Sequence, residues 1–374
     1  MIFHKNNSQN YQNEFQHNKE NLNLNNINEQ KLNNEIKMDI EVQPNASNEL
    51  MASGATNCSN NTTNSIESIK SNVNNPNILF YPNKNKNNSN FQKPNESINN
   101  TKIFDFEFES NEEYVSFAGE YLNEIYTNLL LDEKEINIKP NMKYMNDQKD
   151  INVQMRAILI DWLIEVHYRF KLKNETLFQT VWIIDTYLSY RQITRAKLQL
   201  LGIASLLISC KSQEIYYPQI KEFINITDGA YVKNELIEME NNVLKILNFN
   251  IVSPTSNDFY NIISKAFNFD KKQFYLGKYF LESSLIDYQM LKHSPSVIAI
   301  SCAYIVMKFF GIDNYKILYS NDVVREECPQ KVLKEAAREI CFLVKNLSQS
   351  SLKAVKEKYS LSQFLNVAQY CEQK

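Results

Sequence analysis

The chain has 374 residues, 43% of them hydrophobic and 22% charged, and its formal net charge is −3 at pH 7. This apolar content allows a sizeable buried core, and the small negative charge argues against nucleic acid or an anionic membrane as the main partner. At about 150 residues per domain, the length predicts two or three domains.

Residues 1–104 are dominated by asparagine, with scattered Lys, Ser and Glu and no sustained apolar period. A segment of this composition cannot bury enough apolar surface to offset the entropy lost on ordering. We therefore predict a disordered, low-complexity tail.

From about residue 105 to about residue 365, apolar residues recur with the period of a helix, and no convincing alternating strand pattern occurs. The sequence therefore predicts an all-α fold. Helices are expected at residues 112–131, 151–169, 174–190, 195–212, 231–247, 255–267, 271–288, 294–310, 329–346 and 350–358.

Two stretches in this helical part are similar to each other. GIASLLISCK (202–211) and AISCAYIVMK (299–308) match small for small and apolar for apolar, and both end on lysine. Each is typical of the central helix of a bundle, although buried helices can also look alike by chance. With SPTS (253–256) as the divider, we predict two tandem five-helix bundles. The domains are then a short N-terminal helix plus first bundle at 105–253, a second bundle at 254–365 and a tail at 366–374.

The stretch MRAILIDWLIEV (155–166) is apolar on two faces of its helix. One face holds Met155, Ile158, Leu159, Trp162 and Val166 at helical spacing. The second holds Ile160, Leu163 and Ile164, with Arg156 in its middle. One apolar face is enough to attach a helix to its core, so the other needs a separate explanation.

Enzymatic and membrane functions find little support. The chain has no Gly-rich phosphate loop, zinc-protease motif or nucleophile elbow, so we expect no catalytic residue and no cofactor. The six cysteines show no C-x-x-C pair or metal-ligand spacing, and no signal peptide is recognisable, which predicts a reduced, intracellular protein with no metal site. The longest apolar run, at 198–209, is shorter than the roughly 20 residues a bilayer requires, so no membrane insertion is expected.

Several motifs, in the same order, closely resemble the cyclin box of A/B-type mitotic cyclins. They are MRAILIDWLIEV, ETLFQTVWIIDTYLS, KLQLLGIASLLISCK and ITDGAYVKNELIEMENNVLKILNFNI, continued by PTSNDF, SSLID, SPSVIA and AVKEKY. The resemblance covers about residues 112–360, and LIDWLIEVH, TLF and ITDGAY lean towards the B type. It implies a two-bundle regulatory subunit that binds a cyclin-dependent kinase. Such a subunit presses the kinase αC helix inward, so that the kinase Lys–Glu ion pair forms.

The resemblance also implies a kinase-binding site. Lys211 and Glu240 match the Lys and Glu of the cyclin box at the kinase interface; an intramolecular salt bridge is the alternative. The apolar contacts that match are Ile208, Leu244, Phe249 and Ile251, with Tyr121 and Ile125 on the preceding helix, although each could be ordinary core. Where most relatives have K-[F/Y]-E-E, this chain has KSQE (211–214), so Ser212 lacks an aromatic ring and Gln213 a carboxylate. We expect this departure to affect kinase affinity but not the fold.

A second implied site is a shallow groove that takes an R-x-L segment of substrates or inhibitors. Its members would be Met155, Ile158, Leu159, Trp162 and Gln199 for the leucine, and Glu165 and Asp228 for the arginine. The alternative is that both faces of the helix are core. Arg156 is assigned differently: the resemblance implies a buried structural ion pair with Asp185, since an unpaired buried charge would cost several kcal/mol.

In the tail, KEN (Lys19, Glu20, Asn21) resembles a degradation signal recognised by the anaphase-promoting ubiquitin ligase. The tail composition would also produce one KEN by chance fairly often. No R-x-x-L destruction box can precede residue 156, where the first arginine stands. No basic localisation cluster is evident, and we expect the protein in both nucleus and cytoplasm.

Two rival functions remain open. A cyclin-fold transcription factor would grip DNA with the same doubled bundle, but it should be basic and often carries a zinc ribbon. A helical scaffold that keeps the fold without activating a kinase is the other, and the KSQE departure keeps it in consideration.

Overall fold

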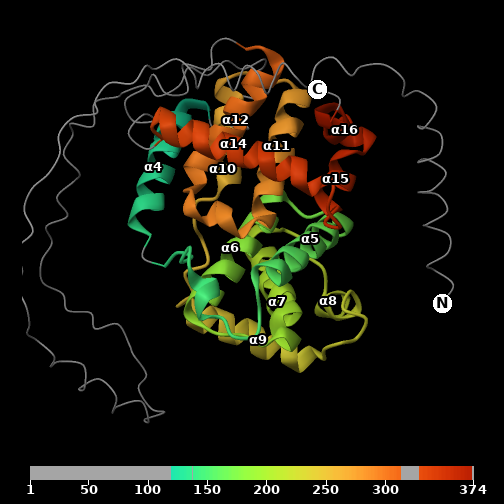
Figure 1. Ribbon diagram of the computed structural model, residues 1–374. Helices are drawn as coiled ribbons and strands as arrows, with labels where there is room; N and C mark the ends of the chain where they lie inside the picture. The colour runs from blue at the N-terminus through green and yellow to red at the C-terminus, as the bar shows by residue number, and fades with distance from the viewer. Residues whose placement is uncertain (1–118, 137, 313–327, 373–374) are drawn as a thin grey trace, which may run out of the picture. The chain divides into compact units, whose positions relative to one another are not determined.

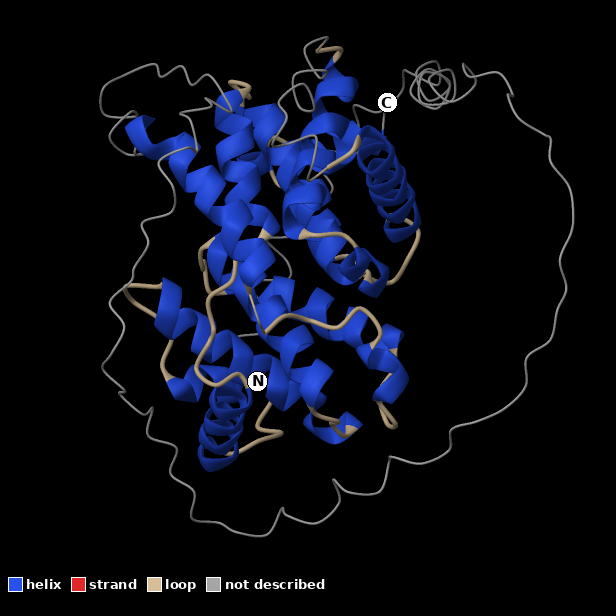
Figure 2. Ribbon diagram, turned by 90° about the vertical axis from the view of Figure 1, so that its left-hand side faces the viewer, coloured by secondary structure: helices blue, strands red, loops and turns tan. Residues whose placement is uncertain are grey.

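A computed structural model of the chain describes residues 119–136, 138–312 and 328–372 (Figure 1). All regular structure within these residues is helical (Figure 2). The predicted all-α class is therefore confirmed for the described part of the chain.

The first bundle is built around a single buried helix. It comprises α5 (Val153–Arg169), α6 (Asn174–Tyr190), α7 (Arg195–Gln213), α8 (Ile220–Asn225) and α9 (Lys233–Ile246). Helix α7 packs against the other four, and all its residues from 200 to 210 are buried. A Cβ atom placed on Gly202 would lie 2.8 Å from Cδ1 of Leu159, so the absence of a side chain there lets α5 approach closely.

The second bundle repeats this plan. It comprises α10 (Ser256–Ala266), α11 (Lys271–Ile286), α12 (Pro295–Phe310), α14 (Gln330–Leu347), α15 (Ala354–Tyr359) and α16 (Val367–Glu372). Helix α12 packs against α10, α11 and α14, as expected from its similarity to α7. The preceding helix α4 (Leu122–Glu135) packs on α10, and its Glu133 carboxylate accepts hydrogen bonds from the backbone N and Oγ of Ser296, at 2.8 and 2.6 Å.

The sequence analysis mainly missed short helices and turns. Helices α8 and α16 were not predicted, nor were the 3-10 turns Tyr144–Asp147, Tyr288–Lys292 and Ser362–Phe364. Gly119–Tyr121 is a 3-10 turn within the range predicted as a helix at 112–131. Six residues or fewer give no usable period. The helix expected at 350–358 begins at Ala354 instead, and the described part of the one expected at 112–131 continues to Glu135.

Helix α5 contributes side chains to the cores of both bundles, and this explains why its second face, with Ile160 and Ile164, is apolar. Leu159, Leu163 and Val166 belong to the first-bundle core, whereas Ile160 and Ile164 are buried with residues of the second bundle. The helix packs against α7 and α6 on one side and against α11 and α15 on the other. The face centred on Ile160 and Ile164 thus joins the bundles.

Candidate functional site

The predicted kinase-binding pair lies at one end of the first bundle. Lys211, in the last turn of α7, donates from Nζ to Oε1 of Glu240 in α9 at 2.5 Å. The Lys211 side chain is 38% exposed and that of Glu240 11%. An ammonium group has three donors, so this contact leaves Lys211 able to bind a further acceptor.

The apolar residues predicted around this pair differ in exposure. Phe249 is 68% exposed and Tyr121 52%, while Leu244, Ile251 and Ile125 are partly buried. Ile208 is only 2% exposed and lies in the first-bundle core. In the isolated chain it therefore packs beneath the surface residues and is not accessible to a partner.

Phe249 has an unusual backbone conformation. Its φ is 60°, and that of the preceding Asn248 is 50°. Both values lie in the left-handed region of backbone conformation, which residues other than glycine seldom adopt. Such a conformation costs roughly 1–2 kcal/mol per residue. Here it accompanies an aromatic ring that is largely exposed.

The sequence analysis missed other members of this exposed apolar surface. Ile215, Tyr216 and Val252 are 79%, 92% and 71% exposed. Gln179 links their two segments, because its Nε2 donates to the carbonyl of Ile251 at 2.8 Å and lies 3.5 Å from Oγ of Ser212. We call Ile215, Tyr216, Phe249 and Val252 the exposed apolar set. The sequence signal was the run IYY directly after KSQE, where apolar residues follow the end of a helix.

The KSQE stretch presents little charge besides Lys211. Ser212 is exposed and offers only a hydroxyl. The Glu214 carboxylate is used within the chain, since its Oε1 accepts from the backbone N of Lys173 at 2.7 Å and from Oγ1 of Thr176 at 2.6 Å.

The predicted groove residues lie on the outward face of α5 and beside it. Ile158 is 52% exposed, Met155, Trp162 and Gln199 are partly buried, and Glu165 and Asp228 are exposed. Leu159 is 6% exposed and packs over Gly202, so it is largely a core residue that can form only the floor of such a groove.

The turn that carries Asp228 returns to α7. Asp228 itself has φ of 52°, and Tyr231 shortly after it donates from its hydroxyl to the carbonyl of Ala196 at 2.8 Å. Ala196 lies one turn before Gln199 on α7, so the turn lies near that end of the proposed groove.

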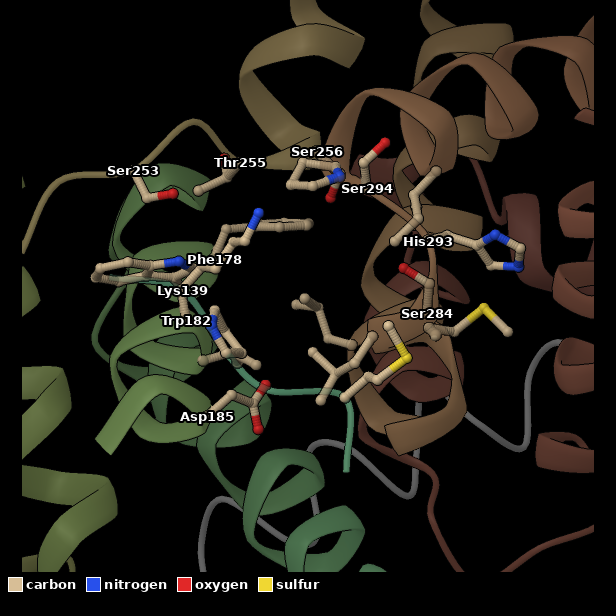
Figure 3. A pocket seen from close by; sticks show the side chains of 18 of the residues that line it. Lys139, Phe178, Trp182, Asp185, Ser253, Thr255, Ser256, Ser284, His293 and Ser294 are labelled. Carbon is tan, nitrogen blue, oxygen red and sulfur yellow. The ribbon is translucent and has the colours of Figure 1, made fainter. Parts of the chain in front are cut away.

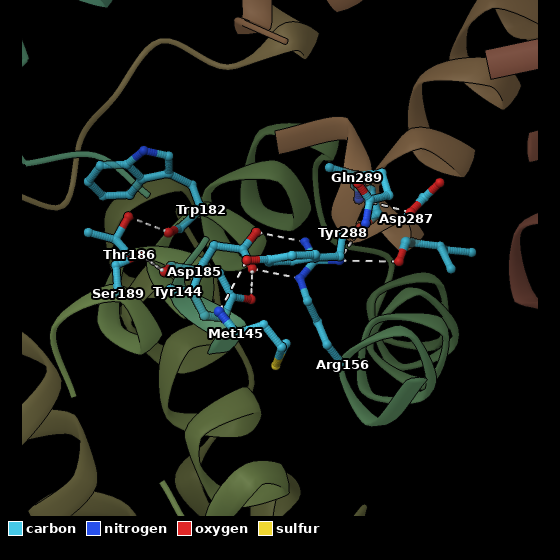
Figure 4. Close-up of polar contacts among 12 residues, drawn as sticks. Tyr144, Met145, Arg156, Trp182, Asp185, Thr186, Ser189, Asp287, Tyr288 and Gln289 are labelled. Atoms are coloured by element: carbon cyan, nitrogen blue, oxygen red, sulfur yellow. Dashed lines mark hydrogen bonds and ion pairs between the residues drawn. The ribbon is translucent and has the colours of Figure 1, made fainter. Parts of the chain in front are cut away.

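Arg156 and Asp185 form a buried pair at the junction of the bundles (Figure 4). The arginine is 1% exposed and the aspartate 1%. Burial lowers the pKa of Arg156, but the charge and hydrogen bonds of Asp185 raise it, with a net rise above the ordinary value. Tyr144 also donates to Oδ1 of Asp185, at 2.7 Å, and burial followed by the Asp185 charge raises the pKa of Tyr144.

The described residues contain no group of three or more His, Cys, Asp and Glu side chains that could hold a metal ion. None of the described helices combines the length and hydrophobicity needed to cross a membrane.

The two histidines of the helical part both have partners within the chain. His167 is buried, with Nε2 2.8 Å from the carbonyl of Lys173, and His293 contacts Glu339. The predicted signal at Lys19, Glu20 and Asn21 lies outside the described residues.

Comparison with known proteins identifies related sequences over the whole helical part. The family model for the cyclin N-terminal domain matches residues 124–252, and that for the cyclin C-terminal domain matches residues 254–373. A G2/mitotic-specific cyclin-B of Hydra vulgaris is 36% identical over 255 residues, which are 68% of this chain and 68% of that protein. Cyclin-B2-1 of Oryza sativa subsp. japonica is 43% identical over 187 residues, 50% of this chain and 44% of that protein.

One solved structure agrees at the level of the fold. A viral cyclin from herpesvirus saimiri has a TM-score of 0.50 and 19% identity, and the match covers 58% of this chain and 97% of that one. The chain spans about two thirds of the Hydra relative and less than half of the rice relative.

Proposed function

The chain belongs to the cyclin family, and from that premise we propose that it is a non-catalytic subunit that binds and activates a cyclin-dependent protein kinase in mitotic cell-cycle control. The observation that carries this proposal is the Lys211–Glu240 pair with the exposed apolar set beside it. Gln179 joins the segments that carry this set, through Ser212, which follows Lys211, and Ile251. Exposed apolar side chains on neighbouring segments are typical of a protein interface, where aromatic anchors supply most of the binding energy.

The arrangement suits a rigid partner for a mobile kinase helix. Lys211 extends from α7, whose preceding turns are buried on all sides, and Glu240 holds the ammonium group in place. A scaffold can shift the conformational equilibrium of its partner only if it binds one state better than the other. A surface anchored in the bundle core, with its charge already oriented, meets that requirement.

The test is co-purification from dividing cells with the tagged full-length chain. We expect a cyclin-dependent kinase to be retained by wild type, identified by mass spectrometry, and its phosphorylation of a histone substrate to be raised. Retention without increased activity would favour the scaffold function that Ser212 suggests. Absence of any kinase would overturn the proposal.

The outward face of α5 supports a second role at a separate place, recruitment of R-x-L substrates or inhibitors. Ile158, Met155 and Trp162 offer apolar contact there, while Glu165 and Asp228 supply negative charge for the arginine. A labelled R-x-L peptide titrated into the kinase complex tests this role. Binding equal to that of a peptide with both residues changed to alanine would contradict it.

We further propose that KEN at Lys19, Glu20 and Asn21 directs degradation through the anaphase-promoting ubiquitin ligase, and that the protein occupies nucleus and cytoplasm. Only the sequence supports these two points. Replacing all three KEN residues by alanine should lengthen the half-life of the protein at mitotic exit. A fluorescent fusion of the full chain would show which compartments the protein occupies.

A further inference from the structure

A cavity of about 320 Å³ lies where the end of α4, helix α6, the 253–256 linker and the start of α12 meet (Figure 3). The buried apolar part of its lining includes Phe178 and Met290, and Trp182 is partly exposed towards it. Met142, 53% exposed, also lines it. A volume of this size holds a small ligand or one to two aromatic side chains.

Most of the charged groups around this cavity are already paired. Arg156 is paired with Asp185, while Lys292 and His293 share the carboxylate of Glu339. The remaining acids also have partners: Glu133 binds Ser296, and Asp287 accepts from the backbone N of Gln289 at 2.9 Å.

Two donors on the lining are without such partners. Among the described residues, nothing accepts a hydrogen bond from the Lys139 ammonium or from the Trp182 indole N–H. Lys139 is exposed, so its charge faces the solvent side of the cavity. The lining therefore favours an occupant that is aromatic or apolar within the cavity and carries acceptors, preferably carboxylates, outside it.

The chain itself contains a segment of this chemistry. Residues 103–109 are IFDFEFE, in which Phe104, Phe106 and Phe108 alternate with Asp105, Glu107 and Glu109. In an extended segment such alternation puts the three rings on one side and the three carboxylates on the other. The Asn-rich tail before it has no comparable cluster of aromatic and acidic residues.

Docking of this segment in the cavity requires residues 110–118 to be extended rather than part of the helix that the sequence predicts from residue 112. These nine residues separate Glu109 from Gly119, where the described part begins, and when extended they span roughly 30–32 Å. The 3-10 turn Gly119–Tyr121 and the 14 residues of α4 together cover about 27 Å, so the extended segment is long enough to reach the cavity.

We propose that this cavity is the docking site of residues 103–109 of the same chain. A Phe ring of the segment packs against Trp182 and Met290, where aromatic and sulfur–aromatic contacts are available. The carboxylates on the other side of the segment interact with Lys139. The interaction fastens the end of the tail to the junction of the bundles, independently of any kinase.

The chain has only two tryptophans, which makes the site observable by fluorescence. In full-length Trp162→Phe protein, all tryptophan emission comes from Trp182. Replacing Phe104, Phe106 and Phe108 by alanine should raise the acrylamide quenching constant at least twofold and move the emission to longer wavelength. The matched control replaces three other tail aromatics, Phe80, Tyr81 and Phe91, by alanine and should change neither value.

A charge exchange tests the proposed pairing. Lys139→Glu should reproduce the effect of the triple alanine variant, and adding Asp105→Lys, Glu107→Lys and Glu109→Lys should reverse it. Lys139 is exposed, so the single change should leave folding intact. Unchanged Trp182 quenching in the triple alanine variant would overturn the proposal. A quenching constant that varies with protein concentration would also overturn it, because a second copy would then supply the segment.

Discussion

Arg156 of α5 binds Asp185 of α6 through both carboxylate oxygens, with Nε–Oδ1 and Nη2–Oδ2 distances of 2.6 and 2.7 Å. Its remaining Nη1 donates to the carbonyls of Leu285 and Ile286 at the end of α11, at 3.1 and 3.2 Å. One guanidinium group thus connects two helices of the first bundle to the second. The apolar surroundings make the pair costly to break, because a single remaining charge would be buried alone.

Asp185→Ala should therefore lower the free energy of unfolding by about 3–5 kcal/mol. Tyr144→Phe removes only one hydrogen bond to the same carboxylate and should cost about 1–2 kcal/mol. Urea unfolding followed by circular dichroism measures both. Equal losses for the two variants would show that the aspartate charge is not what matters.

A buried histidine should make stability depend on pH. Burial, and next the charge of Lys358, lower the pKa of His167 from its ordinary 6.5 to about 4. Between these values the unfolded chain binds a proton that the folded chain does not, so stability falls as the pH falls through 6.5 towards 4. At pH 5 the loss should be about 2 kcal/mol relative to pH 7.

His167→Gln isolates this contribution, since an amide can still donate to the Lys173 carbonyl but does not titrate. The measurement is urea unfolding of both proteins at pH 5 and pH 7. The wild type should lose about 2 kcal/mol more than the variant over this interval. A difference near zero would mean that His167 is protonated in the folded state.

The helices and their buried faces were largely predictable, because α7 and α12 are apolar and small over many consecutive residues. Contacts between helices far apart in the sequence were harder to predict. The Lys358 ammonium binds both Glu282 carboxylate oxygens at 2.7 and 2.8 Å, but these residues lie 76 positions apart and on no common helix. The Arg156–Asp185 pairing was inferable only through the resemblance to cyclins. The exposed apolar set was overlooked because exposure depends on what the fold leaves uncovered, and single residues carry no period.

Two glycines in helices offer a matched test of packing. A Cβ on Gly277 in α11 would lie 1.7 Å from the hydroxyl oxygen of Tyr260, a fully buried ring. A Cβ on Gly202 would lie 2.8 Å from a methyl group of Leu159, which can turn aside. Gly277→Ala should destabilise the protein by about 1–3 kcal/mol. Gly202→Ala should cost less, because the clash with the Leu159 methyl group is milder, while both variants gain the same helix propensity of about 1 kcal/mol. Thermal unfolding of the two variants compares them, and the reverse order would contradict this account.

The proposed kinase surface leads to a prediction that separates binding from folding. Lys211→Ala should reduce kinase retention at least tenfold, because the proposed interface loses its orienting charge. It should change the free energy of unfolding by less than about 1 kcal/mol, since the Lys211 side chain is 38% exposed. Lys197→Ala, another exposed lysine of α7 but at its opposite end, is the control and should retain the kinase. Parallel loss of stability and kinase binding in Lys211→Ala would indicate a structural role.

The groove prediction depends on which residues of α5 can be removed without opening the core. Leu159→Ala would leave a cavity over Gly202, at a cost of about 2–5 kcal/mol, and so cannot report on docking alone. Ile158→Ala combined with Trp162→Ala removes exposed or partly exposed side chains instead. Fluorescence anisotropy with an R-x-L peptide should then show at least tenfold weaker binding, while kinase retention is unchanged. Glu165→Gln with Asp228→Asn should weaken the same peptide but leave a control with alanine for arginine unaffected, because only the charge contact has been removed. If the peptide binds the Ile158/Trp162 variant as well as wild type, the outward face of α5 is not a docking site.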